Sequence, residues 1–190
     1  MIYPLVNWAQ IAQSAGVLDP AYEAQFHALH PGTDHNGQII LPGQRDNGDR
    51  DLGWKLTAVS DGQIVAAGFY PVFGNIALLA FTAPDGRRWW AQYAHARRLL
   101  VKPGQWVKAG EVIGGMGKGA DNAFPSHLHF EIRRDPPSVV SPDCWPSAKF
   151  RDRASAVAFI QRHYVVDQAA WFKFYGAASV NVPLSLIQLQ

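Results

Sequence analysis

Two histidines separated by one residue carry the strongest chemical signal in the chain. His127 and His129 lie in residues 126–133, a short segment that we predict to be a β-strand. Side chains at positions i and i+2 of a strand point to the same face, so both imidazoles should reach one common space. Burying two imidazoles is costly unless their ring nitrogens find partners. The pair therefore indicates a site in which one nitrogen binds a metal and another handles protons.

A third histidine, His30, lies four residues before Asp34. The intervening Pro31 and Gly32 argue against a helix, and in an extended backbone positions i and i+4 share a face. A histidine and a carboxylate that converge there, joined by a histidine from a distant strand, would bind zinc and leave one position open. An open position is typical of catalytic zinc, because it holds a water whose pKa falls to about 7.

These motifs resemble those of a known family. The chain is similar to the lysostaphin-type (LytM-like) zinc metallopeptidases, peptidase family M23, which hydrolyse peptide bonds in bacterial peptidoglycan. The family's His-x-Gly-x-Asp is present as residues 30–34, and its His-x-His as residues 127–129. The resemblance covers residues 30–133 in the family's order, with further matches at Ala58-Val59-Ser60-Asp61-Gly62, Phe73-Gly74-Asn75, Tyr93-Ala94-His95 and residues 104–114.

Carried over position by position, the resemblance implies roles for five residues. His30, Asp34 and His129 would be the ligands of one zinc ion per chain. His95 and His127 would be the two catalytic histidines, one of them the general base toward the zinc-bound water, and both could hydrogen-bond the oxyanion. The sequence leaves open which of the two takes the proton. The implied activity is a zinc-dependent endopeptidase acting on peptidoglycan stem peptides or cross-bridges.

Short apolar segments between turn residues predict the elements that position these side chains. Residues 56–133 have the pattern of an antiparallel β-sheet, with hairpins expected at Asp61-Gly62 and Asp85-Gly86. Helical spacing is present in residues 5–27, in residues 154–160 and around residues 169–175. The expected fold class is mainly β: an antiparallel, LytM-like β-sheet core with short N-terminal and C-terminal helices packed on it.

The chain is expected to form one structural unit with three parts. Residues 1–29 are an N-terminal helical extension, residues 30–134 an M23-like catalytic β domain, and residues 135–190 a proline-rich crossover and helical tail. A chain of 190 residues suffices for one well-buried domain and is short for two. On the tail helix, the face packed on the core is expected to hold Ala154, Val157, Ala158 and Ile160.

Composition narrows the range of partners. A net charge of +2 suits an anionic surface such as a cell wall and is too small to indicate nucleic acid binding. No segment approaches the about 20 apolar residues of a membrane-spanning helix, so we expect no membrane insertion. The amino terminus lacks the features of a signal peptide. We therefore expect delivery to the wall as a phage lysin, as a virion-associated lysin or through an exporting partner; the oligomeric state stays open.

The remaining histidines and the cysteine have simpler interpretations. We expect His27 at the surface or between helices, His35 pointing away from the metal, and His163 in a structural or solvated position. The single cysteine, Cys144, excludes an intramolecular disulfide and is expected to be a small, partly buried thiol.

Two further groups of residues allow a functional and a structural interpretation. Trp89, Trp90 and Trp106 could line a substrate groove, but aromatic residues on strands more often pack in a core. The charged residues 46–51 could bind calcium, but they lack the regular oxygen spacing of a calcium loop, so a solvated loop is favoured. The link between Asp34 and Ala58 is longer than in the family, so substrate preference cannot be taken from a relative.

Two alternative functions compete with the endopeptidase. The first is a non-catalytic wall-binding or regulatory module, since some members of the family have lost ligands; here every ligand is present. The second is a biotinyl or lipoyl carrier, because residues 101–110 resemble the hairpin of such domains. Lys108 and Lys118 do not lie in the tight turn that a carrier lysine requires, and carriers have no histidine cluster.

Overall fold

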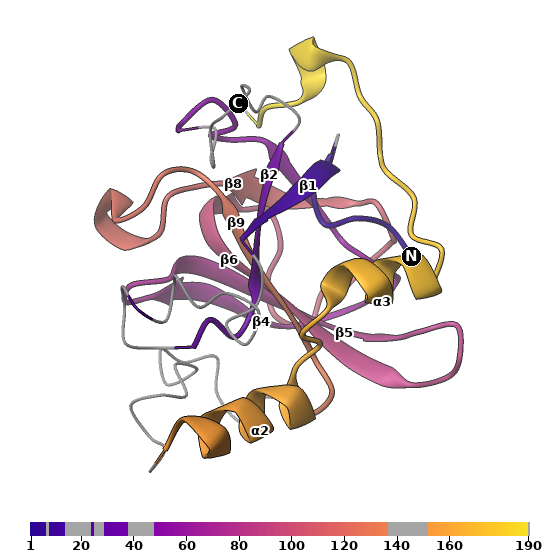
Figure 1. Ribbon diagram of the computed structural model, residues 1–190. Helices are drawn as coiled ribbons and strands as arrows, with labels where there is room; N and C mark the ends of the chain where they lie inside the picture. The colour runs from indigo at the N-terminus through magenta and orange to yellow at the C-terminus, as the bar shows by residue number, and fades with distance from the viewer. Residues whose placement is uncertain (7, 14–23, 25–28, 38–47, 137–151, 190) are drawn as a thin grey trace.

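Nine strands among the described residues form one antiparallel sheet, shown in the computed structural model of Figure 1. The structure describes residues 1–6, 8–13, 24, 29–37, 48–136 and 152–189. The order is β1-β2-β9-β6-β5-β4-β7, and β3 pairs with β8, which also pairs with β6. The strands are β1 (Trp8–Gln13), β2 (Thr33–Gly37), β3 (Lys55–Thr57), β4 (Gly62–Tyr70), β5 (Gly74–Thr82), β6 (Arg88–Leu99), β7 (Trp106–Val107), β8 (Val112–Met116) and β9 (Leu128–Arg133).

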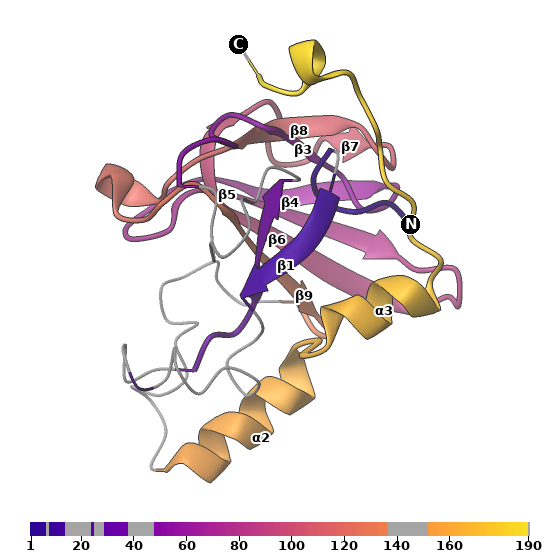
Figure 2. The same cartoon turned by 45° about the horizontal axis from the view of Figure 1, so that its top comes forward.

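The central strand β6 changes its pairing partner along its length. Its first half pairs with β9, ending at Ala94 opposite His129, and its second half pairs with β8, beginning at Ala96 opposite Met116. Figure 2 shows β3 and β8 together above the rest of the sheet. His95 therefore lies at the point where β6 leaves one partner for the next.

Alternation along β9 separates a core face from a second face of the sheet. Leu128, Phe130 and Ile132 belong to the main hydrophobic core, so period-2 alternation places the intervening His129 and Glu131 on the opposite face. Both of these polar residues are nevertheless buried. The sheet therefore offers an enclosed polar environment behind its apolar core.

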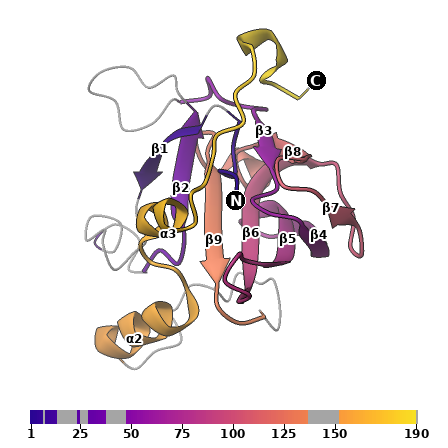
Figure 3. The same ribbon diagram turned by 90° about the vertical axis from the view of Figure 1, so that its right-hand side faces the viewer.

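Two α-helices, α2 (Arg153–His163) and α3 (Gln168–Phe174), cover the β2–β9 side of the sheet (Figure 3). Phe172 of α3 stacks on Phe130 with ring centroids 6.1 Å apart. Ile160 of α2 is buried in a cluster with Leu29, the residue that precedes His30. The short 3-10 helices η2 (Ala120–Asn122) and η5 (Leu184–Leu186) complete the described elements. Among the described residues, no helix is long and apolar enough to span a membrane.

The expected fold class is confirmed, but the expected N-terminal helix is wrong for residues 8–13. These residues form β1, which pairs with β2 through contacts such as Ile11 opposite His35. The edge of β2 presents backbone N–H and C=O groups that need hydrogen-bond partners. Pairing with this edge makes residues 8–13 a strand in spite of their helical spacing. Residues 14–23 and 25–28 of the expected helix lie outside the described residues. The division into three parts stays a prediction.

Two details of the sequence-based prediction also need correction, whereas a third is confirmed. Asp61-Gly62 does not join a β3–β4 hairpin, because β3 pairs with β8 while Gly62 pairs with Val107 and Phe81. Asp85-Gly86 does connect the β5–β6 hairpin, and Gly86 has a φ of 82°. On α2 the buried positions include Ala156 and Ile160, whereas Ala154 and Ala158 are exposed.

The turn between β4 and β5 contains a strained residue. Val72 has a φ of 70°, a region that a β-branched side chain rarely adopts. Its carbonyl oxygen accepts a hydrogen bond from the Ala120 backbone N–H, with 3.1 Å between the two atoms. The contact fixes the turn in this conformation.

We expect Val72→Gly to stabilise the protein, because glycine removes a strain of about 1 kcal/mol. The gain should raise the melting temperature by about 2–4 °C in differential scanning calorimetry. Val65→Gly is the control: this exposed residue lies within β4 at an ordinary φ, so its replacement should lower the melting temperature. A Val72→Gly protein that melts below the wild type would show that the turn is not strained.

Candidate metal centre

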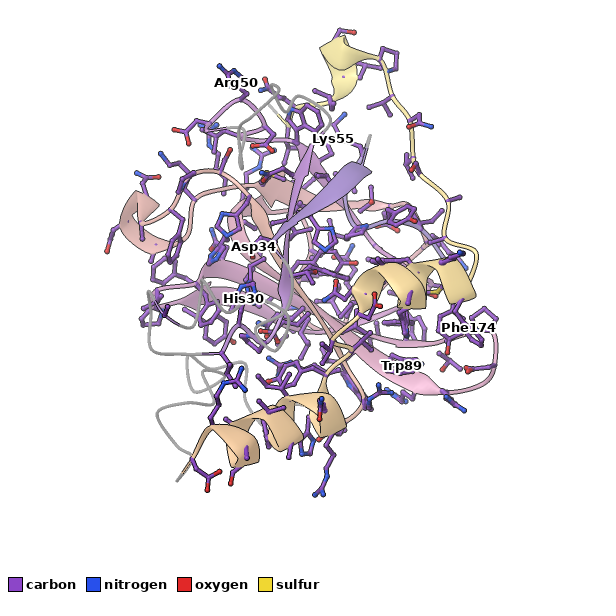
Figure 4. The ribbon with its side chains drawn as sticks, viewed as in Figure 1. His30, Asp34, Arg50, Lys55, Trp89 and Phe174 are labelled. Carbon is purple, nitrogen blue, oxygen red and sulfur yellow. The ribbon has the colours of Figure 1, made fainter. Side chains whose placement is uncertain are left out.

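Three side chains converge on one point: Asp34 from β2, His129 from the neighbouring strand β9, and His30 from the segment just before β2. His30 Nε2 lies 2.9 Å from His129 Nδ1, and Asp34 Oδ1 lies 3.3 Å from each of these nitrogens. Asp34 and His129 are directly opposite in the β2–β9 pairing, which places their side chains on the same face. Figure 4 shows His30 and Asp34 next to each other beside β2.

This group fits a bound cation. Oδ1 of Asp34 is buried and has no hydrogen-bond partner among the described residues. A buried carboxylate oxygen without a partner is costly, and a cation would remove that cost. Ligand atoms around tetrahedral zinc lie about 3.4 Å from one another, close to the spacing here. Two imidazole nitrogens and one carboxylate oxygen are a donor set that zinc accepts.

A chain of buried polar groups fixes the orientation of His129. His129 Nε2 donates to Glu131 Oε1 at 3.0 Å, and Arg133 Nε donates to Glu131 Oε2 at 2.8 Å. Arg133 Nη2 in turn donates to Gln92 Oε1 at 2.9 Å. Because Nε2 of His129 is committed to Glu131, its Nδ1 faces His30 and Asp34.

The charges of these hydrogen-bonded side chains determine the pKa values of the site residues. Burial raises the pKa of Glu131, but Arg133 and His129 lower it to about 2. Burial lowers the pKa of His129, but the nearby carboxylates of Asp34 and Glu131 raise it to about 9. Burial likewise raises the pKa of Asp34, and the surrounding histidines bring it well below its usual value. Asp34 and Glu131 are therefore carboxylates at neutral pH.

Two further imidazoles lie beside the group and are oriented by main-chain carbonyls. His95, with a φ of 63°, donates from Nδ1 to the Phe73 carbonyl at 3.0 Å. His127 donates from Nδ1 to the Pro125 carbonyl at 2.8 Å, and its Nε2 lies 3.6 Å from Asp34 Oδ1. The two rings contact each other edge to face, with centroids 4.7 Å apart.

These carbonyl contacts determine the state of the two rings. A carbonyl oxygen only accepts hydrogen bonds, so each Nδ1 carries its proton and each neutral ring has its lone pair on Nε2. Burial and the neighbouring His127 and His129 hold the pKa of His95 well below its ordinary value. His95 is therefore a neutral imidazole at pH 7, with an unprotonated Nε2.

Comparison with known proteins agrees with this arrangement. Residues 49–141 match peptidase family M23. This segment belongs to peptidase family M23. The matched segment includes His95, His127 and His129, and it begins after His30 and Asp34.

Two M23-type relatives and one solved structure illustrate the similarity. Glycyl-glycine endopeptidase ALE-1 of Staphylococcus capitis is 37% identical over 83 residues, which is 43% of this chain and 22% of that protein. Peptidoglycan DD-endopeptidase ShyB of Vibrio cholerae is 27% identical over 149 residues, 76% of this chain and 33% of that protein. A zinc-containing peptidase from Vibrio cholerae shares the fold, with a TM-score of 0.50, 24% identity and coverage of 68% of this chain and 35% of that structure. The chain thus spans between 22% and 35% of the length of these proteins.

The M23 fold brings together all five residues singled out from the sequence: His30, Asp34, His95, His127 and His129. Their individual roles stay predictions. Glu131 was not singled out, although its position two residues after His129 on a strand places both side chains on one face.

Of the other histidines, His35 and His163 lie apart from the five site residues. His35 points to the opposite face and is fully buried, with Nε2 2.7 Å from Thr33 Oγ1, and burial lowers its pKa to about 4. His163 forms an ion pair with Asp135 at 2.8 Å. His27 and Cys144 lie outside the described residues.

The tryptophans and the charged loop differ in part from expectation. Trp89 is buried in the core, whereas Trp106 on β7 is 72% exposed. Within residues 46–51, the carboxylate of Asp51 is fully buried, so the expectation of a solvated loop is wrong at this position. Its carboxylate accepts hydrogen bonds from Gly37 and Ser126, which lie in two other segments, so the local sequence could not indicate its burial.

We expect Glu131→Gln to weaken zinc binding, because the amide cannot stabilise the His129 ring as a carboxylate does. Loss of such a partner typically costs about 10–100-fold in metal affinity. Competition with a fluorescent chelator measures the effect. Glu111→Gln is the matched control, since Glu111 accepts a hydrogen bond from the Lys108 backbone in a partly exposed turn. Equal zinc affinity in the two variants would exclude this role of Glu131.

Zinc uptake should release protons at pH 7.5. With a pKa of about 9, His129 carries its second proton at this pH, and a metal ion that takes Nδ1 must displace it. We expect release of about one proton per chain from this residue, measured by calorimetry in buffers of different ionisation enthalpy. Zinc binding without any proton release would contradict the raised pKa.

Proposed function

We propose that the chain is a zinc-dependent endopeptidase that hydrolyses peptide bonds in bacterial peptidoglycan. The observation that carries the proposal is the buried Asp34 Oδ1, which lacks a hydrogen-bond partner among the described residues and faces the His30 and His129 nitrogens. Membership in a peptidase family supports the reaction. The names of the relatives, a glycyl-glycine endopeptidase and a peptidoglycan DD-endopeptidase, support the substrate class.

In this proposal His30, Asp34 and His129 hold one zinc ion per chain. Zinc held by three protein ligands supplies a Lewis acid and lowers the pKa of a bound water to about 7. The pairing of β2 with β9 keeps two of the three ligands, Asp34 and His129, opposite each other. Such preorganisation is what a catalytic metal site requires.

The two remaining imidazoles would carry the proton transfers. His95 and His127 each direct a basic Nε2 away from the carbonyl that holds Nδ1. One neutral ring can accept a proton from the attacking water, and a protonated ring can donate to the oxyanion or to the leaving amine. Because the rings touch, a substrate carbonyl placed beside one is within reach of the other. We assign both rings to this step as a pair.

We expect His129→Ala and His127→Ala to separate metal binding from turnover. His129→Ala removes a ligand and should abolish both zinc content and hydrolysis. His127→Ala should keep about one zinc per chain and lose about 10²–10⁴-fold in turnover number. Elemental analysis gives the zinc content, and mass spectrometry of digested cross-linked muropeptides gives the rate.

His163→Ala serves as the control, because His163, the last residue of α2, pairs with Asp135 and has no described contact with the five site residues. It should keep both zinc and activity. A His129→Ala protein that is folded, free of zinc and fully active would refute the proposed function.

A further inference from the structure

We propose that Asp51 and Ser126 are positioning residues for His127. Together they fasten the segment that carries His127 to the end of β2, the strand that carries Asp34. The inference deepens the proposed function and rests on it for the role of His127. It also assigns a structural role to residues 48–51, near the C-terminal end of the long link between Asp34 and Ala58.

Asp51 joins two parts of the chain through its buried carboxylate. Oδ2 accepts a hydrogen bond from the backbone N–H of Gly37, the last residue of β2, at 3.0 Å. Oδ1 accepts a hydrogen bond from the Ser126 hydroxyl. Asp51 is completely buried, as is Ser126. A buried carboxylate is maintained only when such donors compensate its desolvation.

Neighbouring residues strengthen the same connection. The Ser126 hydroxyl also lies 3.0 Å from the Gly48 carbonyl oxygen, and the Ser126 backbone N–H donates to Asp49 Oδ1 at 3.3 Å. Asp49 Oδ2 lies 2.8 Å from Lys118 Nζ. Residues 48–51 thus bind Ser126 through both its side chain and its main chain. Through Asp51 they also bind Gly37 at the end of β2.

The connection determines where the His127 ring points. The His127 ring is oriented by the Pro125 carbonyl, which belongs to the peptide unit that contains the Ser126 N–H. Holding Ser126 therefore fixes that carbonyl, because the peptide unit is planar and rigid. The backbone N–H of His127 adds only a long contact of 3.3 Å to the Gly117 carbonyl. Without Ser126 and Asp51, the ring would lose the support that keeps its Nε2 near Asp34.

The decisive test compares Ser126→Ala and Asp51→Asn with the rescue variant Ser126→Thr, which keeps the hydroxyl. Asp61→Asn is the matched control, because Asp61 also joins two segments through a carboxylate, accepting from the Ala109 backbone at 2.8 Å and pairing with Lys108. Each zinc-loaded protein is assayed for kcat and KM on a cross-linked muropeptide dimer. Nitrogen-15 NMR of the imidazoles reports the tautomer of His127.

We expect Ser126→Ala and Asp51→Asn to retain zinc and KM while kcat falls by about 100-fold, the effect of misplacing a reacting group by about 1 Å. The His127 ring should lose its single Nδ1–H tautomer in both. Ser126→Thr should restore kcat to within about threefold, and Asp61→Asn should leave kcat unchanged.

Unchanged kcat and an unchanged His127 tautomer in Ser126→Ala, with only a lower melting temperature, would overturn the inference. If the wild type binds zinc and cleaves no muropeptide, the proposed function fails. The NMR comparison then still decides whether Asp51 and Ser126 orient His127.

Discussion

The buried negative charge of Asp34 is the constraint on which the rest of the site depends. Its carboxylate lies among nitrogens of His30, His127 and His129, and the pKa stays well below its usual range despite burial. A charge in this position must be compensated, either by protonated imidazoles or by a metal cation. The Glu131 carboxylate behind His129 keeps that ring basic. Metal binding at this site would therefore displace a proton, and the two equilibria would be coupled.

Strand alternation lets one segment serve stability and chemistry together. In β9, Phe130 and its apolar neighbours fill the main core, while His129 and Glu131 use the opposite face. A shift of the register by one residue would exchange these faces and destroy both at once. The core therefore enforces the geometry of the metal group, and no separate device is needed to hold His129 opposite Asp34.

The sequence permits prediction of local geometry and leaves long-range pairing undetermined. The spacings of His30 with Asp34 and of His127 with His129 indicate a shared face, because both follow from strand periodicity. The pairing of β1 with β2 could not be predicted, since helical spacing in residues 8–13 says nothing of an open edge far along the chain. The burial of Asp51 could not be predicted either, because it also depends on a long-range contact. Its partner Ser126 is 75 residues away, and a polar segment alone resembles a solvated loop.

The two imidazoles beside the metal group are held in a different way from the ligands. His95 and His127 both donate to main-chain carbonyls, so their tautomers depend on backbone conformation and not on the identity of a neighbouring side chain. The conformation of the turns at Phe73 and Pro125 therefore decides where each carbonyl points. The shape is then what must be maintained: the strained turn at Val72 fixes the carbonyl for His95. The hydrogen bonds around Ser126 do the same for His127. Strand register fixes Asp34 and His129, whereas turns fix His95 and His127, so the proposed metal ligands and the proposed proton carriers are held by separate parts of the fold.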